Sequence, residues 1–228
     1  MTAAGLRVVS YNVRGLRAGA GAAAVAGVLR ELDADVVLLQ EVPKLLLWRG
    51  RCAALARRAD LLYAGGGGTT GGTALFTSIR VDVREVREHR LRATPGLTRR
   101  GVVLARLVKD GVPFGAASIH LGLDAGERAR HLTDITGLIN RLGAAIMVVG
   151  GDVNEEPSAP TWTRLASHYA DAGAAVSTPT FPVASPRRRI DGVFVRGAVE
   201  VCSCRVADTE QVRRASDHRP VVADLTLA

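Results

Sequence analysis

Aromatic residues and lysine are both scarce in this sequence. Its 228 residues include only two Trp, three Tyr and four Phe, so aromatic residues make up 4% of the chain. Proteins that bind single-stranded nucleic acid usually stack the bases on aromatic side chains. The shortage of rings therefore disfavours a base-stacking surface. Lysine occurs only at Lys44 and Lys109, so arginine supplies almost all of the 30 basic residues.

The basic residues outnumber the acidic ones. Thirty Lys and Arg stand against 22 Asp and Glu, which gives a formal net charge of +8. Such a surface attracts polyanions and speeds their encounter with the protein. The arginine comes with abundant Ala, Gly and Val, however, a combination that GC-rich coding DNA produces without any functional cause. From charge alone, this codon bias is slightly favoured over nucleic-acid binding.

The sequence also lacks the cysteine patterns of disulfide frameworks and zinc sites. Cys52, Cys202 and Cys204 match no zinc or redox spacing, and we expect buried, reduced thiols. Cys202 and Cys204 lie two apart in an alternating segment, which predicts that both face the same side of a strand. No apolar run reaches the length of a membrane span, and the opening segment MTAAGL has no signal-peptide pattern. These features predict a cytoplasmic protein without stable membrane insertion.

Apolar segments separated by helical patterns predict an α/β protein. Continuous or alternating apolar runs predict strands at 6–12, 35–41, 73–78, 79–83, 101–109, 112–120, 144–149, 190–195, 199–206 and 220–227. Apolar residues at helical spacing predict helices over 20–32, 45–58 and 126–142. Hairpins and helical crossovers are mixed, so we expect two mixed β-sheets packed on each other. No linker divides residues 1–228, which predicts a single domain.

Three short segments add local detail. Asp110–Gly111 between two strands predicts a two-residue hairpin turn. A change in the phase of alternation at Glu85–Val86 indicates a β-bulge or the start of a new element. The segment Gly65–Gly72 lacks the GK[ST] ending of a phosphate-binding P-loop, so we expect a flexible surface turn there.

Polar side chains recur at the ends of the predicted strands. Each has an ordinary explanation as a turn, a helix cap or a hydrogen-bonded structural residue. The repetition is harder to explain, because the ends of strands are where α/β proteins assemble their sites. We therefore predict one site built from Asn12, Glu41, His120, Asp152, Asn154, Asp191, Asp217 and His218.

The chemistry of this set favours a hard divalent cation and a phosphate ester. Glu41, Asn12 and Asp217 offer the oxygen ligands that such a cation prefers. The spacings typical of zinc sites are absent, which favours Mg²⁺ or Mn²⁺. Asp191 is a candidate partner that fixes the tautomer of His218 and supports its cationic form. Metal-assisted hydrolysis of a phosphate ester is the reaction class that fits these groups.

Six motifs in one order resemble a known superfamily. They are SYNVRG (10–15), LLQEV (38–42), SIHLG (118–122), GGDVNEEP (150–157), RRID (188–191) and SDHRP (216–220). Together they resemble the endonuclease/exonuclease/phosphatase superfamily, which includes DNase I, exonuclease III-like AP endonucleases, neutral sphingomyelinases and inositol polyphosphate 5-phosphatases. The resemblance implies a DNase I-like, four-layered α/β sandwich in which helices flank two packed mixed β-sheets.

The resemblance also implies a role for each residue of the set. It implies that Glu41 is the principal metal ligand, with Asn12 and Asp217 beside it. Asp152 would orient or deprotonate the attacking water, and Asn154 would hold that water or the phosphate. The pair His218–Asp191 would contact the phosphate, and His120 would stabilise the transition state or assist the leaving group. Two further positions, Arg100 and Arg189, resemble phosphate-contacting arginines.

Three classes of function remain open from the sequence. The first is a metal-dependent phosphoesterase acting as a loosely specific nuclease or phosphodiesterase. The second is hydrolysis of a small phosphorylated metabolite, an inositol phosphate or a phospholipid head group. The third is a non-catalytic binding protein with the same fold, which a buried acidic cluster disfavours. The apolar stretch Leu45–Trp48 is predicted to pack its helix on the sheet rather than touch a membrane, and we expect a monomer.

Overall fold

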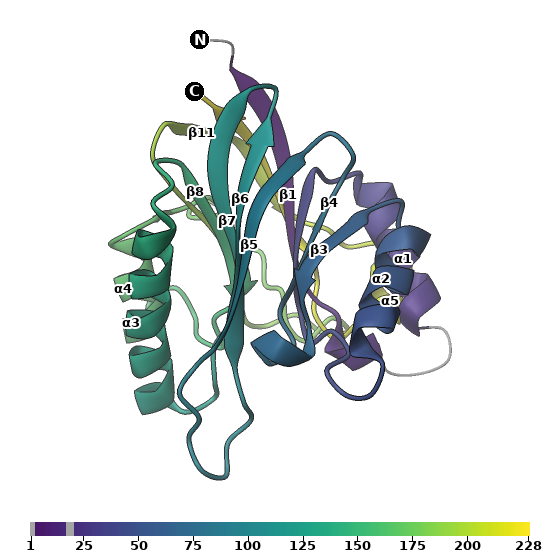
Figure 1. Cartoon of the computed structure of the whole chain (residues 1–228). Helices are drawn as coiled ribbons and strands as arrows, with labels where there is room; N and C mark the ends of the chain where they lie inside the picture. Colours follow the sequence, from purple (N-terminus) through teal and green to yellow (C-terminus); the bar gives the residue numbers. More distant parts are fainter. Residues whose placement is uncertain (1–2, 17–20) are drawn as a thin grey trace.

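Two six-stranded sheets pack face to face, and helices cover both outer faces (Figure 1). The computed structural model describes residues 3–16 and 21–228. The four-layered α/β sandwich predicted from the sequence is confirmed.

Both sheets mix parallel and antiparallel neighbours. The first has the order β11-β12-β1-β2-β4-β3, with β11 (Val199–Val206), β12 (Val221–Leu227), β1 (Ala4–Asn12), β2 (Val36–Gln40), β4 (Ala74–Thr77) and β3 (Leu62–Gly66). The second has the order β5-β6-β7-β8-β10-β9, with β5 (Asp82–Arg90), β6 (Gly101–Lys109), β7 (Val112–His120), β8 (Met147–Asp152), β10 (Asp191–Arg196) and β9 (Ala170–Asp171).

The strand directions gather the predicted polar residues at one edge of the sandwich. β1 and β2 are parallel, as are β7 and β8. β12 runs antiparallel to β1, and β10 runs antiparallel to β8. The carboxyl ends of the parallel strands therefore meet the starting ends of β10 and β12. In the second sheet, Asp152 is paired in register with both His120 and Asp191.

Each face of each sheet has its own apolar contacts. Between the sheets lie fully buried side chains such as Val8, Leu38, Leu75, Val103, Val148 and Val193. The helices α1 (Gly21–Leu32), α2 (Trp48–Arg58) and α5 (Glu210–Ala215) pack on the first sheet. The second sheet is covered by α3 (Ala125–Leu142) and α4 (Pro160–Ala166). Two short 3₁₀ turns, η1 (Arg14–Leu16) and η2 (Gly68–Thr70), complete the regular elements of the described residues.

Most predicted elements are present, with differences at their boundaries. The predicted helix at 126–142 is α3, whose first turn is capped by the side chain of Asp124 accepting from the N–H of Glu127 at 2.7 Å. The phase change near Glu85 is a β-bulge, as predicted. Of the helix predicted over 20–32, residue 20 lies outside the described residues.

Two predicted segments differ from the structure in a physically informative way. The strand predicted at 79–83 is instead a turn followed by β5, and Arg80 in this turn binds Asp35 at 2.7 Å. The helix predicted over 45–58 begins only at Trp48. Leu45, Leu46 and Leu47 precede it and are 77%, 84% and 75% exposed, so the prediction that they pack on the sheet is wrong.

The glycine-rich segment lies mostly inside the protein, so its predicted surface position is wrong. Gly65, Gly66, Gly67 and Gly72 are buried, and the carbonyl of Thr73 accepts from the N–H of Gly67 at 2.6 Å. The ring of Trp48 packs so close that a Cβ on Gly67 would lie 2.4 Å from it. These glycines therefore serve close packing in addition to turning the chain.

The cysteines are free, as predicted, but they are not all buried. Cys52 is buried, Cys204 is half-buried and Cys202 is exposed. A shift of register between Val201 and Ser203 interrupts the alternation of β11. This bulge explains why residues two apart do not share one environment. Along the described ranges, no helix is both long and apolar enough to cross a bilayer.

Close packing of β7 on β8 predicts that Gly151 tolerates no side chain. A Cβ on Gly151 would lie 2.1 Å from the carbonyl oxygen of Ile119. We expect Gly151→Ala to lower the free energy of unfolding by about 1–3 kcal/mol, because the backbone must shift. Gly5→Ala in β1 is the matched control, since nothing lies within 4 Å of its added Cβ. Urea titration followed by circular dichroism measures both, and equal stability of the two variants would contradict the prediction.

Candidate active site

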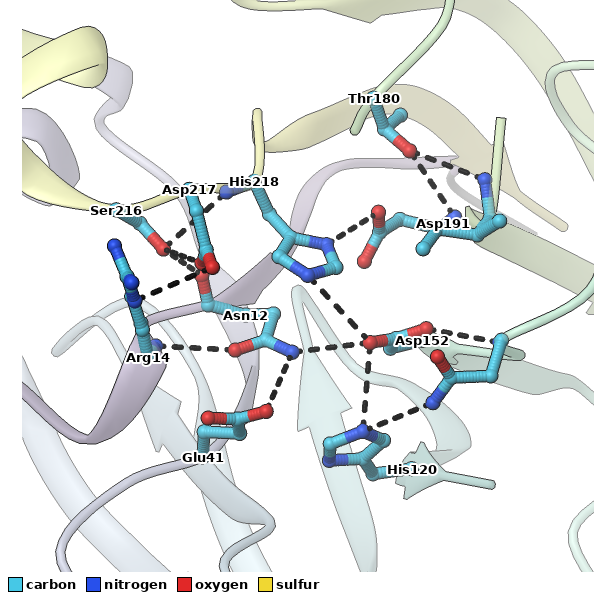
Figure 2. Close-up of polar contacts among 12 residues, drawn as sticks. Asn12, Arg14, Glu41, His120, Asp152, Thr180, Asp191, Ser216, Asp217 and His218 are labelled. Atoms are coloured by element: carbon cyan, nitrogen blue, oxygen red, sulfur yellow. Dashed lines mark hydrogen bonds and ion pairs between the residues drawn. The ribbon is translucent and has the colours of Figure 1, made fainter. Parts of the chain in front are cut away.

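The carboxylate of Asp152, at the end of β8, lies at the centre of a polar cluster (Figure 2). Its Oδ2 accepts from Asn12 Nδ2 at 3.0 Å. The same oxygen is 3.4 Å from His120 Nε2 and 3.8 Å from His218 Nε2. Asn12 ends β1 of the first sheet and His218 lies just before β12 of that sheet, whereas His120 and Asp152 belong to the second sheet. The cluster therefore joins the two sheets at the edge where their strands end.

His218 forms a tight pair with Asp191. His218 Nδ1 donates to Asp191 Oδ2 at 2.9 Å, and both side chains are buried. Burial by itself lowers the pKa of His218, but the carboxylates of Asp191, Asp152 and Asp217 more than reverse this and raise the pKa to about 9. The imidazole of His218 is therefore positively charged at neutral pH. The ring of Phe181 lies against it, with ring centroids 4.7 Å apart.

His120, unlike His218, is held in its neutral form. Burial, followed by the positive charges of Arg100, His218 and Lys44, holds the pKa of His120 well below its usual range. Arg100 Nη1 lies 2.9 Å from His120 Nδ1. A guanidinium can only donate, so Nδ1 accepts and the proton of the neutral ring lies on Nε2. That N–H points toward Asp152.

The pKa of the Asp152 carboxyl is raised above its usual range. Burial is the main cause that raises its pKa, and the nearby carboxylate of Asp191 raises it further. The positive charge of His218, together with hydrogen bonds from Asn12 and from the N–H of Asn154, acts in the other direction. A carboxylate with a raised pKa is a stronger base, which suits it to accept a proton from water. Asn154 itself donates from Nδ2 to the carbonyl of Leu121 at 2.9 Å.

Glu41 follows β2 directly and faces the same cluster. Its backbone has φ +55°, a left-handed conformation that is uncommon for Glu and is typically retained at functional sites. Asn12 Nδ2 lies 3.4 Å from Glu41 Oε1. The other carboxylates of the cluster each have a cationic or imidazole partner within 4 Å, whereas the described residues supply none for Glu41.

Asp217 lies at the rim of the cluster, where it is partly exposed. Its Oδ2 is 3.3 Å from Nε of Arg14, and its Oδ1 lies 3.4 Å from Ser216 Oγ. The Ser216 hydroxyl donates to the carbonyl oxygen of Asn12 at 2.6 Å. Ser216 therefore ties the segment before β12 to the end of β1.

The donor set fits a divalent cation. The carboxylate oxygens predominate in the cluster, and Asp191 Oδ1 is buried without a hydrogen-bond partner in the described part of the chain. The residues whose ligand atoms all lie within 4.8 Å of one another are Asp152, Asp191 and His218. This group differs from the predicted ligands Glu41, Asn12 and Asp217. The protonated ring of His218 neutralises much of the charge of Asp191. Glu41 has no such partner among the described residues, so it keeps more negative charge with which to bind a cation.

Of the two arginines predicted to bind phosphate, the structure brings only Arg100 to the cluster. Both terminal nitrogens of Arg189 are used by Asp171, at 2.9 Å and 2.7 Å. Its guanidinium also lies 4.9 Å from the ring centroid of Trp162 and is buried. These contacts tie Arg189 to β9 at the edge of the second sheet and differ from the predicted contact with phosphate.

Several supporting residues were not predicted. Thr180 Oγ1 accepts from the N–H groups of Ile190 and Asp191 at 3.1 Å and 3.3 Å, which fixes the start of β10. The N–H of Arg14 donates to Asn12 Oδ1 at 3.0 Å. Ser216 lies inside the SDHRP motif and Arg14 inside the SYNVRG motif, so these motifs contained a signal for both residues. Thr180 and Phe181 lie in a segment without a recognisable pattern.

Comparisons with known proteins identify the superfamily. The family model described as the Endonuclease/Exonuclease/phosphatase family matches residues 9–218, so the chain belongs to this family. Its members are hydrolases that act on phosphate esters, and they typically use divalent metals. No curated protein matches the chain significantly.

Solved structures share the fold at low sequence identity. A Bacteroides thetaiotaomicron protein of the same family has a TM-score of 0.82 at 20% identity, with all of both chains covered. The mannosyl-6-phosphatase of that organism has a TM-score of 0.77 at 18% identity, covering 96% of this chain and 99% of its own. TDP2 of D. rerio, complexed with a single-strand DNA product, has a TM-score of 0.75 at 19% identity, covering 97% and 98%.

The pairing of His218 with Asp191 predicts how the imidazole titrates. We expect Asp191→Asn to lower the pKa of His218 by at least about one unit, because the strongest of the carboxylates that oppose burial is lost. Asp217→Asn is the matched control and is expected to have the smaller effect. NMR titration of the His218 ring in each variant measures the change. An unchanged pKa in Asp191→Asn would contradict this account of the pair.

Proposed function

We propose that this chain is a divalent-metal-dependent phosphoesterase that hydrolyses a phosphate ester by in-line attack of water. The observation that carries the proposal is the cluster around Asp152, in which a carboxylate of raised pKa faces a charged and a neutral histidine. Environments that push the pKa values of neighbouring groups apart are a common way to divide acid, base and electrostatic roles within a site.

Each side chain has a distinct part in the proposed reaction. Asp152 accepts a proton from water as the water oxygen forms a bond to phosphorus. The bond from phosphorus to the leaving oxygen breaks on the opposite side, and that oxygen takes a proton from solvent. The positive charge of His218 and the Nε2–H of His120 stabilise the negative charge on the phosphoryl oxygens. Asp191 holds His218 in its cationic form, and Asn154 lines the same edge.

The cation in this proposal is Mg²⁺ or Mn²⁺. Glu41 would hold it, with Asn12 and Asp217 beside it. When bound, the metal supplies positive charge against the phosphate oxygens. The unneutralised carboxylate of Glu41 supports this assignment, since uncompensated charge at the edge of a buried cluster favours a cationic partner.

The preferred substrate class is a phosphodiester, which makes the protein a loosely specific nuclease or phosphodiesterase. The net charge of +8 supports attraction of polyanions. A second candidate is a phosphatase on a small phosphorylated metabolite, which the structural likeness to a mannosyl-6-phosphatase favours. A substrate panel separates these two candidates. It contains supercoiled DNA, RNA, abasic duplex, a sugar phosphate, inositol phosphates and sphingomyelin, each assayed with Mg²⁺ and with Mn²⁺.

The proposed roles predict severe losses of activity from two substitutions. We expect Asp152→Ala and His218→Ala each to lower kcat by about 10²-fold or more, because a base or a phosphate-stabilising charge is removed. Hydrolysis of bis-p-nitrophenyl phosphate measures the rate, and circular dichroism checks the fold. Asp134→Ala and His168→Ala are controls on exposed positions. Near-wild-type rates in either site variant would refute the assignment.

The metal assignment predicts two linked results. A chelator is expected to abolish turnover, and added Mg²⁺ or Mn²⁺ is expected to restore it. Glu41→Ala is expected to weaken binding of Mn²⁺, measured by calorimetry, by about tenfold or more, because the main carboxylate ligand is lost. Glu31→Ala, on the exposed face of α1, controls for the change in net charge. Turnover that persists in the chelator, or an unchanged titration for Glu41→Ala, would argue against the assignment.

A further inference from the structure

A cavity of about 440 Å³ lies beside the cluster and takes no part in the proposed chemistry. Three segments form its wall: Lys44 and Leu45 after β2, Gly68 and Gly71 of the glycine-rich turn, and the connection between β5 and β6. This connection is the long loop that extends beyond the sheets in Figure 1. The volume falls in the range of small-ligand sites.

The cavity has a strongly one-sided charge. Its wall includes four cationic side chains, Lys44, Arg90, Arg99 and Arg100, and no carboxylate among the described residues. Within the same residues, Lys44, Arg90 and Arg99 form no ion pair with any carboxylate. Elsewhere in the chain, arginines such as Arg80 and Arg213 bind acidic partners within 3 Å. The wall therefore offers positive charge to a ligand instead of to the protein.

Arg100 joins this cavity to the catalytic cluster. It lines the wall, while its Nη1 contacts His120 Nδ1 at 2.9 Å. Its Nε is covered by protein atoms, so Arg100 would act on a ligand in the cavity through its positive charge. A ligand there would lie next to the residues that bind the scissile phosphate.

The glycine-rich turn holds the basic segments in place. A Cβ on Gly71, which has φ +65°, would lie 2.7 Å from the carbonyl oxygen of Arg99 and 2.8 Å from Arg100 Cα. A Cβ on Gly68 would lie 2.9 Å from the carbonyl oxygen of Lys44. The turn thus packs against both sides of the cavity wall, so the cations are set on closely packed backbone.

We propose that this cavity is a subsite for a second phosphate group of the substrate, while the scissile phosphate lies in the Asp152 cluster. The inference rests on the proposed phosphoesterase function and narrows its substrate to compounds that carry at least two phosphates. The guanidinium groups of Arg90 and Arg99 and the ammonium group of Lys44 can bind such a phosphate by charge-assisted hydrogen bonds. A nucleotide chain and a bisphosphorylated metabolite share this chemistry.

Matched pairs of substrates test the subsite. One pair is the p-nitrophenyl ester of thymidine 5′-phosphate with and without a 3′-phosphate, and the other is a hexose bisphosphate and its monophosphate. We expect the wild type to have the higher kcat/KM for the doubly phosphorylated member of at least one pair. In Arg90→Gln/Arg99→Gln this preference is expected to fall about tenfold, through KM, because two charge-assisted contacts are lost. The pair with the larger preference identifies the source of the second phosphate.

The control variant removes two positive charges that lie outside the cavity wall. Arg84 lies at the other end of β5, and Arg205 lies in β11 on the other sheet; both are exposed. Arg84→Gln/Arg205→Gln is expected to keep the wild-type preference. No preference in the wild type, or a preference that Arg90→Gln/Arg99→Gln retains, overturns the subsite.

A binding measurement separates this inference from the proposed function. Inorganic pyrophosphate is titrated into the chelator-treated protein by calorimetry. We expect Arg90→Gln/Arg99→Gln to bind it about tenfold more weakly than the wild type and the control variant do. If the wild type hydrolyses neither pair nor any substrate of the panel above, the proposed function fails, and this titration still decides the subsite. Equal affinity in wild type and Arg90→Gln/Arg99→Gln, or no binding to the wild type, overturns it.

Discussion

The hydrogen bond from Asn12 to Asp152 crosses from one sheet to the other, and the geometry of the cluster depends on it. Asn12 ends β1 in the first sheet, and Asp152 ends β8 in the second. Behind this contact, Ser118 donates to the carbonyl of Leu39 at 2.7 Å, again between the sheets. Apolar packing brings the two sheets together without direction, whereas these buried polar contacts fix their relative position.

Charge in the cluster is divided between two histidines that lie on either side of one carboxylate. His218 gains its proton from the carboxylates around it, and His120 loses its own to burial and to neighbouring cations. Neither state follows from the residue type, because both arise from what the two sheets bring together. Glu41 is different, since the described residues supply no cationic partner within 4 Å of its carboxylate.

The sequence was a good guide wherever a physical rule links neighbouring residues. Apolar runs that end in polar residues predicted β1, β2, β7 and β8, and with them the cluster. The rule failed where a distant partner decides the outcome. Asp35 binds Arg80 in the turn that replaces the start of the predicted strand, and Asp171 binds both terminal nitrogens of Arg189. The exposure of Leu45–Leu47 and the bulge at Cys202 likewise depend on neighbours that local spacing does not reveal.

The order of the strands has a consequence for truncated variants. β12 lies between β11 and the first strand, β1, and His218 lies in the segment just before β12. A variant cut before Ser216 would lose Asp217 and His218, and it would also leave β1 without its antiparallel neighbour. Such a cut therefore removes one side of the cluster and exposes an unpaired strand edge in the first sheet at the same time.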